Sequence, residues 1–228
     1  MQYQGGKAKA CKAIVKTMVD NGLTDQVVVE PFCGACHVTY ELCRIGRTVH
    51  ASDLNRSLIM MWQKALAEGV SSFPIDDYDS WKTAAPSAEK ALVGYGASWG
   101  GKWFGGLARN NLNRDYLGNA VRSVNKYASA MRGKVVFNDC SYLDLCDSTG
   151  LVYYLDKPYA STTSHYGGDF DHDQFWEWTR ERARENLVFV SEYEAPIGTC
   201  IMEMETPLSM AAGKNNKGRK QIERLFKI

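Results

Sequence analysis

The sequence lacks several features that would place it in a class at once. No apolar run approaches the roughly 18 to 20 residues that a bilayer-spanning helix needs, and residues 1–7 lack the apolar segment of a signal peptide. It also has no internal repeat and no low-complexity tract. We therefore expect a cytoplasmic protein without a membrane partner. Its 228 residues, 45% of them hydrophobic, suffice for one well-buried domain with a smaller insertion.

Net charge and paired cysteines are also scarce. Lysines and arginines (27) nearly balance the acids (26), so any affinity for nucleic acid must come from local clustering. The seven cysteines are an odd number, which favours free, packed thiols over a disulfide framework. Cys33 and Cys36 have CxxC spacing, but a structural zinc site needs a second close pair, and Cys140 and Cys146 are far along the chain. We expect no metal, with zinc or redox chemistry as the alternative.

Hydrophobic periodicity predicts alternating helices and strands. The first half begins helix, strand, helix, strand, helix, which opens a parallel sheet: residues 7–19, 27–30, 38–45, a strand ending at Asp53, and 58–67. The second half continues with a helix, two strands, a crossover helix, a strand and a short terminal helix: residues 115–131, 134–137, 151–156, 170–185, 187–191 and 221–226.

The periodicity degrades between these halves, in a stretch rich in glycine and aromatic residues. We therefore predict an α/β fold whose main domain comprises residues 1–69 and 115–228, with an inserted subdomain at residues 70–114.

The most informative motif is Asp156-Lys157-Pro158-Tyr159, directly after the apolar run 151–155. Open α/β sheets bind ligands outside the carboxyl ends of their strands, where loops aim side chains at a substrate. A carboxylate there can accept a hydrogen bond from an amine, and a tyrosine offers a face on which a planar ring can stack. An exocyclic amino group on a nucleobase would satisfy both.

Other strand ends carry candidate ligand-binding residues. The turn from Pro31 to Cys36 follows the first strand, where small residues let backbone N–H groups approach a ligand, although it is not a GxGxxG fingerprint. About twenty residues on, Asp53 is placed to bind ribose hydroxyls. Asp139 could meet an adenine amino group, and Gly6-Lys7 could bring a cation to an anion. Ordinary turns and a helix-capping aspartate are the alternatives.

Cations and aromatic rings alternate between Ser98 and Met131, where Asp115 is the only acid. This mixture suits a nucleic acid surface, with an ordinary solvated face as the alternative. The residues that we expect to contact nucleic acid are Trp99, Lys102, Trp103, Arg109, Arg114 and Lys126.

With these pieces in order, the chain resembles the Dam-like DNA adenine N6-methyltransferases, particularly the compact forms of phages and prophages. The resemblance covers nearly the whole length. The matching segments are residues 3–7, 30–34, 52–55, 100–104, 138–139, 156–159 and 191–193. Their order, with the cofactor loop first, the recognition insertion next and the catalytic loop last, is that of the family's α arrangement.

The resemblance implies a Rossmann-like methyltransferase sheet, S-adenosylmethionine as methyl donor, and double-stranded DNA with a flipped adenine as substrate. The implied cofactor-binding residues are Tyr3, Gly6, Lys7, Glu30, Pro31, Phe32, Gly34, Cys36, Asp53, Asp139 and Asp156. The catalytic loop would be Asp156, Lys157, Pro158 and Tyr159, in which Asp156 accepts a hydrogen bond from the target amine and Tyr159 stacks on the base. A bacterial host cytoplasm, protection from restriction, and a monomer or weak dimer are also expected.

Two positions depart from the family pattern. Lys157 replaces a proline, and we expect its ammonium either to pair with Asp156 or to point to solvent or a phosphate. Cys36 stands where a second glycine is usual. These departures motivate an alternative function, a catalytically weakened relative that binds DNA or cofactor. An RNA methyltransferase and a nicotinamide-dependent dehydrogenase are further alternatives; the recognition insertion argues against the first, and the second leaves residues 156–159 unexplained.

Overall fold

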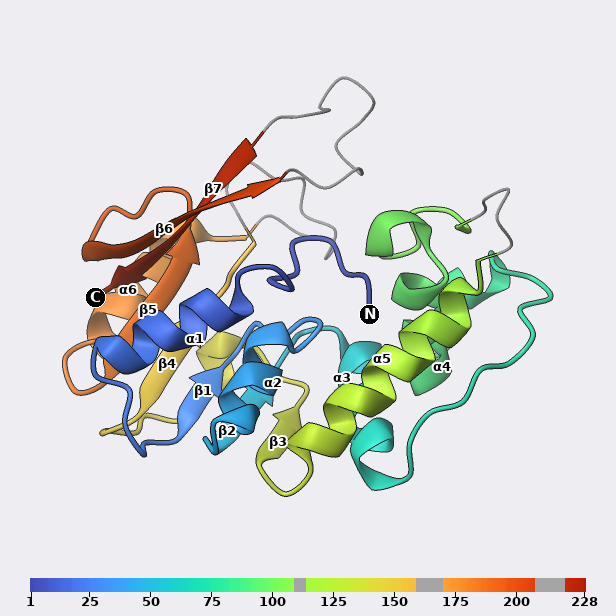
Figure 1. Cartoon of the computed structure of the whole chain (residues 1–228), viewed down its shortest axis with the longest axis horizontal. Coiled ribbons are helices and arrows are strands. Elements are labelled where there is room, and N and C mark those ends of the chain that lie inside the picture. Colours follow the sequence, from blue (N-terminus) through green and yellow to red (C-terminus); the bar gives the residue numbers. More distant parts are fainter. Residues whose placement is uncertain (109–113, 159–169, 208–219) are drawn as a thin grey trace.

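The computed structural model in Figure 1 describes residues 1–108, 114–158, 170–207 and 220–228. Seven strands form one sheet in the order β3-β2-β1-β4-β5-β7-β6. In chain order they are β1 (Val28–Glu30), β2 (Val49–Ser52), β3 (Val135–Asn138), β4 (Val152–Leu155), β5 (Leu187–Glu192), β6 (Thr199–Pro207) and β7 (Lys220–Lys227).

The first five strands run parallel, and β1 lies between β2 and β4. The chain therefore winds outward in both directions from β1, and the switch between them lies between β1 and β4. β7 runs antiparallel between β5 and β6. This arrangement confirms the α/β fold class that the sequence predicts, with a largely parallel, doubly wound sheet.

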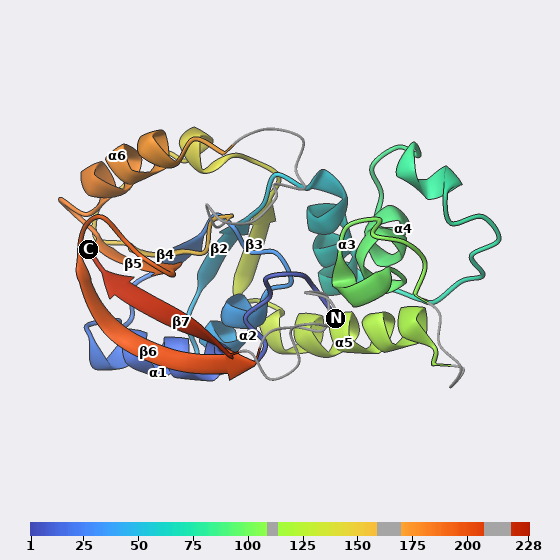
Figure 2. The same ribbon diagram turned by 90° about the horizontal axis from the view of Figure 1, so that it is seen from above.

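Helices cover both faces of the sheet, as Figure 2 shows, with α1 and α2 on one face and α6 on the other. Alternating strand residues fill two cores. Val28 and Tyr154 belong to the core on the α1 side, whereas Tyr153 and Leu155 pack on the α6 side. The α-helices are α1 (Cys11–Asp20), α2 (His37–Arg44), α3 (Arg56–Ala67), α4 (Ala88–Ala91), α5 (Tyr116–Met131) and α6 (His172–Arg182). None of the helices in the described part of the chain has the length and hydrophobicity that crossing a membrane requires.

The predicted insertion packs against α3 and α5 at one end of the molecule (Figure 1). Besides α4 it contains short helical turns, namely η1 (Ser80–Lys82), the π-helix η2 (Leu92–Gly96) and η3 (Trp99–Gly101); a further turn, η4 (Tyr142–Asp144), follows β3. Two glycines of η2 make close contacts possible. A Cβ at Gly96 would lie 2.6 Å from Cβ of Ala120 on α5, and one at Gly94 would lie 2.4 Å from the Trp103 ring.

The prediction of a helix at residues 221–226 is wrong, because this segment is part of β7. Val190 of β5 pairs with Phe226, and Ser191 pairs with Leu225. The sequence pattern does not predict β6 either. The apolar pattern of so short a segment does not separate helix from strand, and here the open edge of β5 decides the conformation.

Candidate active site

Three carboxylates lie at the carboxyl edge of the sheet. Glu30 ends β1, Asp53 directly follows β2, and Asp156 directly follows β4. Because these strands are parallel neighbours, their ends meet beside the switch point. The structure thus brings together residues that are more than a hundred positions apart in sequence.

The Asp156 carboxylate binds the ammonium group of Lys7. Lys7 Nζ lies 2.7 Å from Oδ1 of Asp156 and 3.4 Å from Oε1 of Glu223 on β7. Burial lowers the pKa of Lys7, but the two carboxylates more than offset it, so the net shift is upward. Burial raises the pKa of Asp156 to about 6, although the Lys7 ammonium opposes the shift. At neutral pH, Asp156 is therefore an ionised acceptor held beside a cation.

Asp53 joins the end of β2 to the turn after β1. Its carboxylate accepts hydrogen bonds from the backbone N–H groups of Gly34, at 3.0 Å, and Asn55, at 2.9 Å. Burial raises the pKa of Asp53 to about 6, against the opposing effect of these two donors. The Asn55 side chain in turn caps α3 by accepting from the Leu58 N–H. The turn is thus fixed by side chains of the next strand.

The turn itself contains two left-handed residues. Gly34 has φ +46°, and a Cβ there would lie 3.0 Å from the Tyr3 ring. Cys36 has φ +55° and directly precedes α2. A left-handed conformation favours glycine. Glycine would therefore suit position 36, and cysteine is an unusual residue there. The buried thiol lies 3.8 Å from the Gly34 carbonyl oxygen.

Glu30 is the most deeply buried of the three acids. Its carboxyl group accepts a 2.5 Å hydrogen bond from the Thr39 hydroxyl. Burial raises the pKa of Glu30 to about 8, with the nearby Asp156 charge adding to the shift. Glu30 is therefore mostly protonated at neutral pH, whereas Asp156 is mostly ionised.

The Lys157 ammonium pairs with Glu192, so both orientations predicted for it from the sequence are wrong. The Lys157 side chain is buried, and its Nζ atom donates to Glu192 Oε2 at the end of β5 and lies 3.4 Å from the Pro158 carbonyl oxygen. Strand alternation explains this, because Tyr153, Leu155 and residue 157 lie on the α6 side, while Asp156 lies on the other side and binds Lys7. Lys157 therefore does not occupy the acceptor on Asp156.

Aromatic rings surround this ion pair. The Lys157 ammonium lies 5.6 to 6.0 Å from the ring centroids of Phe170, Phe175 and Trp176. Phe32, from the turn after β1, packs on Phe170 and Phe175 at centroid distances of 6.1 and 6.0 Å. The buried residue Pro31 precedes it. Phe32 is thus mainly a packing residue that connects the turn to the α6 layer.

The N-terminal segment bridges the turn and the insertion. The Tyr3 ring lies 4.7 Å from that of Tyr95 in η2, and the Tyr95 hydroxyl accepts a hydrogen bond from Asn55. Gln4 donates its N–H to the Gly101 carbonyl oxygen. Gly6 lies against the His37 ring, where a Cβ would be 3.1 Å away. Burial lowers the pKa of His37 to about 4, so the ring is neutral.

Two predicted site residues are not placed with the others. The Asp139 side chain is 47% exposed and forms an ion pair with Arg56 Nε at 3.4 Å. Tyr159 lies outside the described residues, so its stacking role stays a prediction.

The predicted DNA contacts divide by exposure. Trp99 is 49% exposed, and Arg114 and Lys126 are also exposed. Lys102 is half-buried. Trp103 packs between Tyr95 and Phe104, at centroid distances of 4.6 and 4.7 Å, which gives it a packing role within the insertion. Arg109 lies outside the described residues.

Cys33 and Cys36 are buried free thiols, and burial raises the pKa of both. Within the described ranges, no group of three or more His, Cys, Asp or Glu residues is arranged to hold a metal ion.

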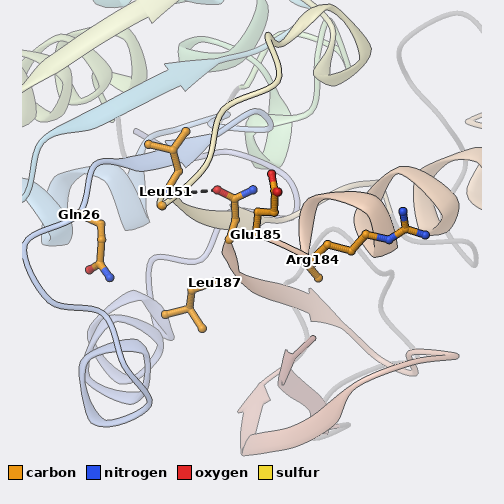
Figure 3. A pocket seen from close by; sticks show the side chains of 8 residues that line it. Gln26, Leu151, Arg184, Glu185 and Leu187 are labelled. Carbon is orange, nitrogen blue, oxygen red and sulfur yellow. Dashed lines mark hydrogen bonds between the residues drawn. The ribbon is translucent and has the colours of Figure 1, made fainter.

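A shallow hollow of about 410 Å³ lies at the opposite, amino edge of the sheet. Figure 3 shows Gln26, Leu151, Arg184 and Leu187 around it, with the Asn186 side chain accepting from the Leu151 N–H at 3.0 Å. It is formed by residues that precede β1, β4 and β5, so it is separate from the carboxylates described above.

A family model matches the first part of the chain. The D12 class N6 adenine-specific DNA methyltransferase model matches residues 3–90. This range contains Lys7, Glu30, the turn from Pro31 to Cys36, and Asp53.

No curated protein matches the chain. Similar solved structures include the rRNA methyltransferase AviRa from Streptomyces viridochromogenes, with 12% identity over 98% of this chain and 86% of that one, at a TM-score of 0.45. The magnesium protoporphyrin IX methyltransferase ChlM from Synechocystis PCC 6803, with bound SAH, is 9% identical over 99% and 84%, at 0.47. A putative methylase from Haemophilus influenzae is 11% identical over 96% and 88%, at 0.44.

Three residues of this region escape prediction from the sequence. The pattern puts Glu223 in a helix, Glu192 stands out only as part of a motif, and Tyr95 falls in an irregular insertion. A signal for Tyr95 exists in Gly94-Tyr95-Gly96, because flanking glycines allow close packing and π-helical turns are frequent at functional sites. No local signal marks Glu223, whose position depends on the pairing of β5 with β7.

Proposed function

We propose that this protein is a DNA adenine N6-methyltransferase that transfers a methyl group from S-adenosylmethionine to the exocyclic amine of a flipped adenine. The observation that carries the proposal is Asp156, an acceptor directly after β4 at the switch point, in the motif where the resemblance puts the catalytic carboxylate. The match of the D12 class model to residues 3–90 supports the same activity from an independent part of the chain.

The residues at the strand ends fit a cationic methyl donor. Five buried or largely buried carboxyl groups lie in this region, against two lysines: Glu30, Asp53, Asp156, Glu192 and Glu223, with Lys7 and Lys157. With Glu30 protonated the excess is still negative, which suits a positively charged sulfonium. In this proposal Asp53 binds the ribose, the turn from Pro31 to Cys36 and Lys7 hold the methionine end, and Asp139 meets the adenine of the donor.

Asp156 prepares the target amine for reaction. S-adenosylmethionine supplies the electrophilic methyl group and leaves as the neutral thioether S-adenosylhomocysteine. The lone pair of adenine N6 is delocalised into the ring, and an N–H bond donated to Asp156 shifts electron density back to nitrogen. One N6 proton must leave as the N–CH₃ bond forms. A carboxylate with a pKa of about 6 accepts this proton more readily than an ordinary exposed aspartate.

The insertion and α5 supply the proposed DNA surface. Extruding a base from duplex DNA costs a few kcal/mol. A hydrogen bond to a charged carboxylate returns about 1.5–3 kcal/mol, and stacking on Tyr159 would return about 1–3 kcal/mol. Recognition of a short palindrome such as GATC would depend on residues 98–114.

The test is incorporation of labelled methyl into unmethylated DNA, followed by nucleoside mass spectrometry. We expect N6-methyladenine with the wild-type protein and a loss of about a hundredfold or more in Asp156→Asn, because the amide cannot take up the proton. Circular dichroism and urea unfolding of both proteins serve as the folding control. Absence of N6-methyladenine across varied DNA, with the donor bound, would favour the binding-module alternative.

A further inference from the structure

We propose that the Lys157–Glu192 pair is a positioning device that holds the Asp156 carboxylate in its working direction, so that in this chain a proline at position 157 would impair the site. The inference rests on the proposed function for its activity readout. It concerns a residue that touches neither the substrate nor the donor in the proposed reaction and acts through its neighbour.

Lys157 contacts both β5 and the next residue of the catalytic loop. Its ammonium binds Glu192 on β5 and lies 3.4 Å from the carbonyl oxygen of Pro158, the next residue. Glu192 is fixed in turn, because its second carboxylate oxygen accepts the Tyr193 N–H at 2.8 Å. Lys157 is only 3% exposed. The side chain therefore ties the loop to β5 at a point where water does not compete.

The aromatic surroundings make this tie directional. Phe175 and Trp176 of α6 lie within 6 Å of the ammonium group, which favours a cation there. Buried ion pairs are weak sources of stability, and their best-attested use is to specify one arrangement. The pair is therefore better explained by placement of the loop than by stability of the fold.

Anchoring Lys157 on one face of the sheet positions Asp156 on the other. Consecutive residues of an extended chain point to opposite sides, so a lysine fixed toward α6 directs the preceding carboxylate toward Lys7. In the usual family pattern a proline restricts this loop through its ring. Here the ion pair serves that purpose, and replacing Lys157 alone would remove the ammonium partner of the buried Glu192 carboxylate, which would keep the Tyr193 N–H as a donor.

The experiment compares Lys157→Pro, Lys157→Met, Glu192→Gln and the double variant Lys157→Met/Glu192→Gln. Three quantities are measured: kcat for methyl transfer, the Kd of S-adenosylmethionine, and the emission of DNA with 2-aminopurine at the target position, without donor. We expect each lysine variant to lower kcat by about tenfold to a hundredfold, the scale on which small misplacements affect rates. The donor Kd should change by less than about twofold, and the 2-aminopurine signal should fall.

The double variant tests whether the two residues act as a unit. If they do, its loss of kcat should match that of the worse single variant, whereas independent effects would multiply. Val188→Ala is the matched control, because it truncates a buried side chain on the same face of β5 without touching the loop. It should lower stability and leave kcat and the 2-aminopurine signal unchanged.

A Lys157→Pro variant with kcat equal to or above wild type overturns the inference, as do multiplicative losses in the double variant. If a lysine variant does not fold, Glu192→Gln tests the inference instead, because it removes the charge on the partner but keeps the lysine and an acceptor. An unchanged kcat and an unchanged 2-aminopurine signal in Glu192→Gln would also overturn the inference. If the wild-type protein binds donor but forms no N6-methyladenine, the proposed function fails. In that case the emission of 2-aminopurine still tests the positioning role.

Discussion

Three carboxyl groups at one edge of the sheet differ in ionisation because their partners differ. Glu30 faces a hydroxyl, Asp53 faces two backbone N–H groups, and Asp156 faces an ammonium group. Burial raises the pKa of all three, to about 8 for Glu30 and about 6 for the two aspartates. At neutral pH Glu30 is therefore mostly neutral, whereas Asp53 and Asp156 are mostly charged, as the acceptor roles that we propose for the two aspartates require.

The pH dependence of methyl transfer should reflect Asp156. We expect kcat/KM to fall below about pH 6, because protonated Asp156 no longer attracts the amine protons. In Lys7→Met this acidic limb should move to higher pH, since the cation that lowers the pKa of Asp156 is gone while burial and Glu223 remain. Rate profiles from about pH 5 to about pH 8 measure the shift.

Lys16→Met is the control for this profile, because Lys16 pairs with Asp20 on the exposed side of α1. Its profile should coincide with that of the wild-type protein. A limb that stays in place in Lys7→Met, or moves to lower pH, would contradict the assignment of the titration to Asp156.

Glu30 should make the folded state less stable as pH rises. Its pKa is about 8 in the folded protein against 4.5 for an unperturbed glutamate, so the folded state binds the proton more tightly. The resulting stability is complete below pH 4.5 and is lost as pH rises through about 8. Glu30→Gln has no proton to lose, and it keeps an acceptor for the Thr39 hydroxyl.

Urea unfolding of both proteins at several pH values tests this. The free energy of unfolding of the wild-type protein should fall relative to Glu30→Gln by about 1.4 kcal/mol per pH unit inside that window. The shifts of Asp53 and Asp156 have the same sign but are common to both proteins. Parallel curves would show that Glu30 does not titrate in this range.

At the scale of elements, the π-helix η2 depends on its glycines. In Gly96→Ala the new Cβ would lie 2.6 Å from Ala120, so η2 must move away from α5. We expect a loss of about 1–3 kcal/mol in the free energy of unfolding, typical of overpacking. DNA affinity should fall while donor affinity is kept. Chemical denaturation and separate titrations with DNA and donor measure these effects.

Ser129→Ala is the control, because Ser129 is an exposed residue of α5, the helix that Gly96 faces. This variant also introduces an alanine. It should change the free energy of unfolding by less than about 0.5 kcal/mol and leave both affinities unchanged. If Gly96→Ala weakened donor binding as strongly as DNA binding, the insertion would not be the separate recognition element that we propose.

The sequence predicts those elements whose conformation depends on local pattern. Apolar runs identify β1, β4 and β5, and strand ends mark Asp53 and Asp156, because alternation and position along a strand are local properties. Local pattern does not predict the strand at residues 220–227 or the ion-pair partner of Lys157. Both depend on contacts with β5, which is distant in sequence from each of them. A short segment with a mixed pattern can form a helix or a strand, and a lysine beside an aspartate can have several ion-pair partners. Tertiary contacts determine which of these is found.

At the scale of the whole molecule, a net charge of +1 hides an uneven distribution. Acidic groups are buried at the strand ends, whereas exposed cations lie on α5 and beside it: Arg114, Arg122 and Lys126. If this surface binds DNA phosphates, removing one lysine–phosphate interaction should reduce the salt dependence of binding by about one unit of slope.

Lys126→Ala and Lys102→Ala test this by DNA titration at several salt concentrations. We expect weaker binding and a flatter slope for each, with no change in donor affinity. Lys12→Ala removes an exposed lysine from α1 and should leave the slope unchanged. An unchanged slope in Lys126→Ala would remove this residue from the interface.

The position of β7 also affects how the protein is made. β7 follows every other strand in sequence, yet it lies between β5 and β6 and carries Glu223 to Lys7. During translation the parallel strands and β6 leave the ribosome before β7 does. Until β7 has emerged, β5 keeps an open edge and β6 lacks its neighbouring strand. A nascent chain therefore cannot complete the group of acids around Lys7 until β7, which carries Glu223, has left the ribosome.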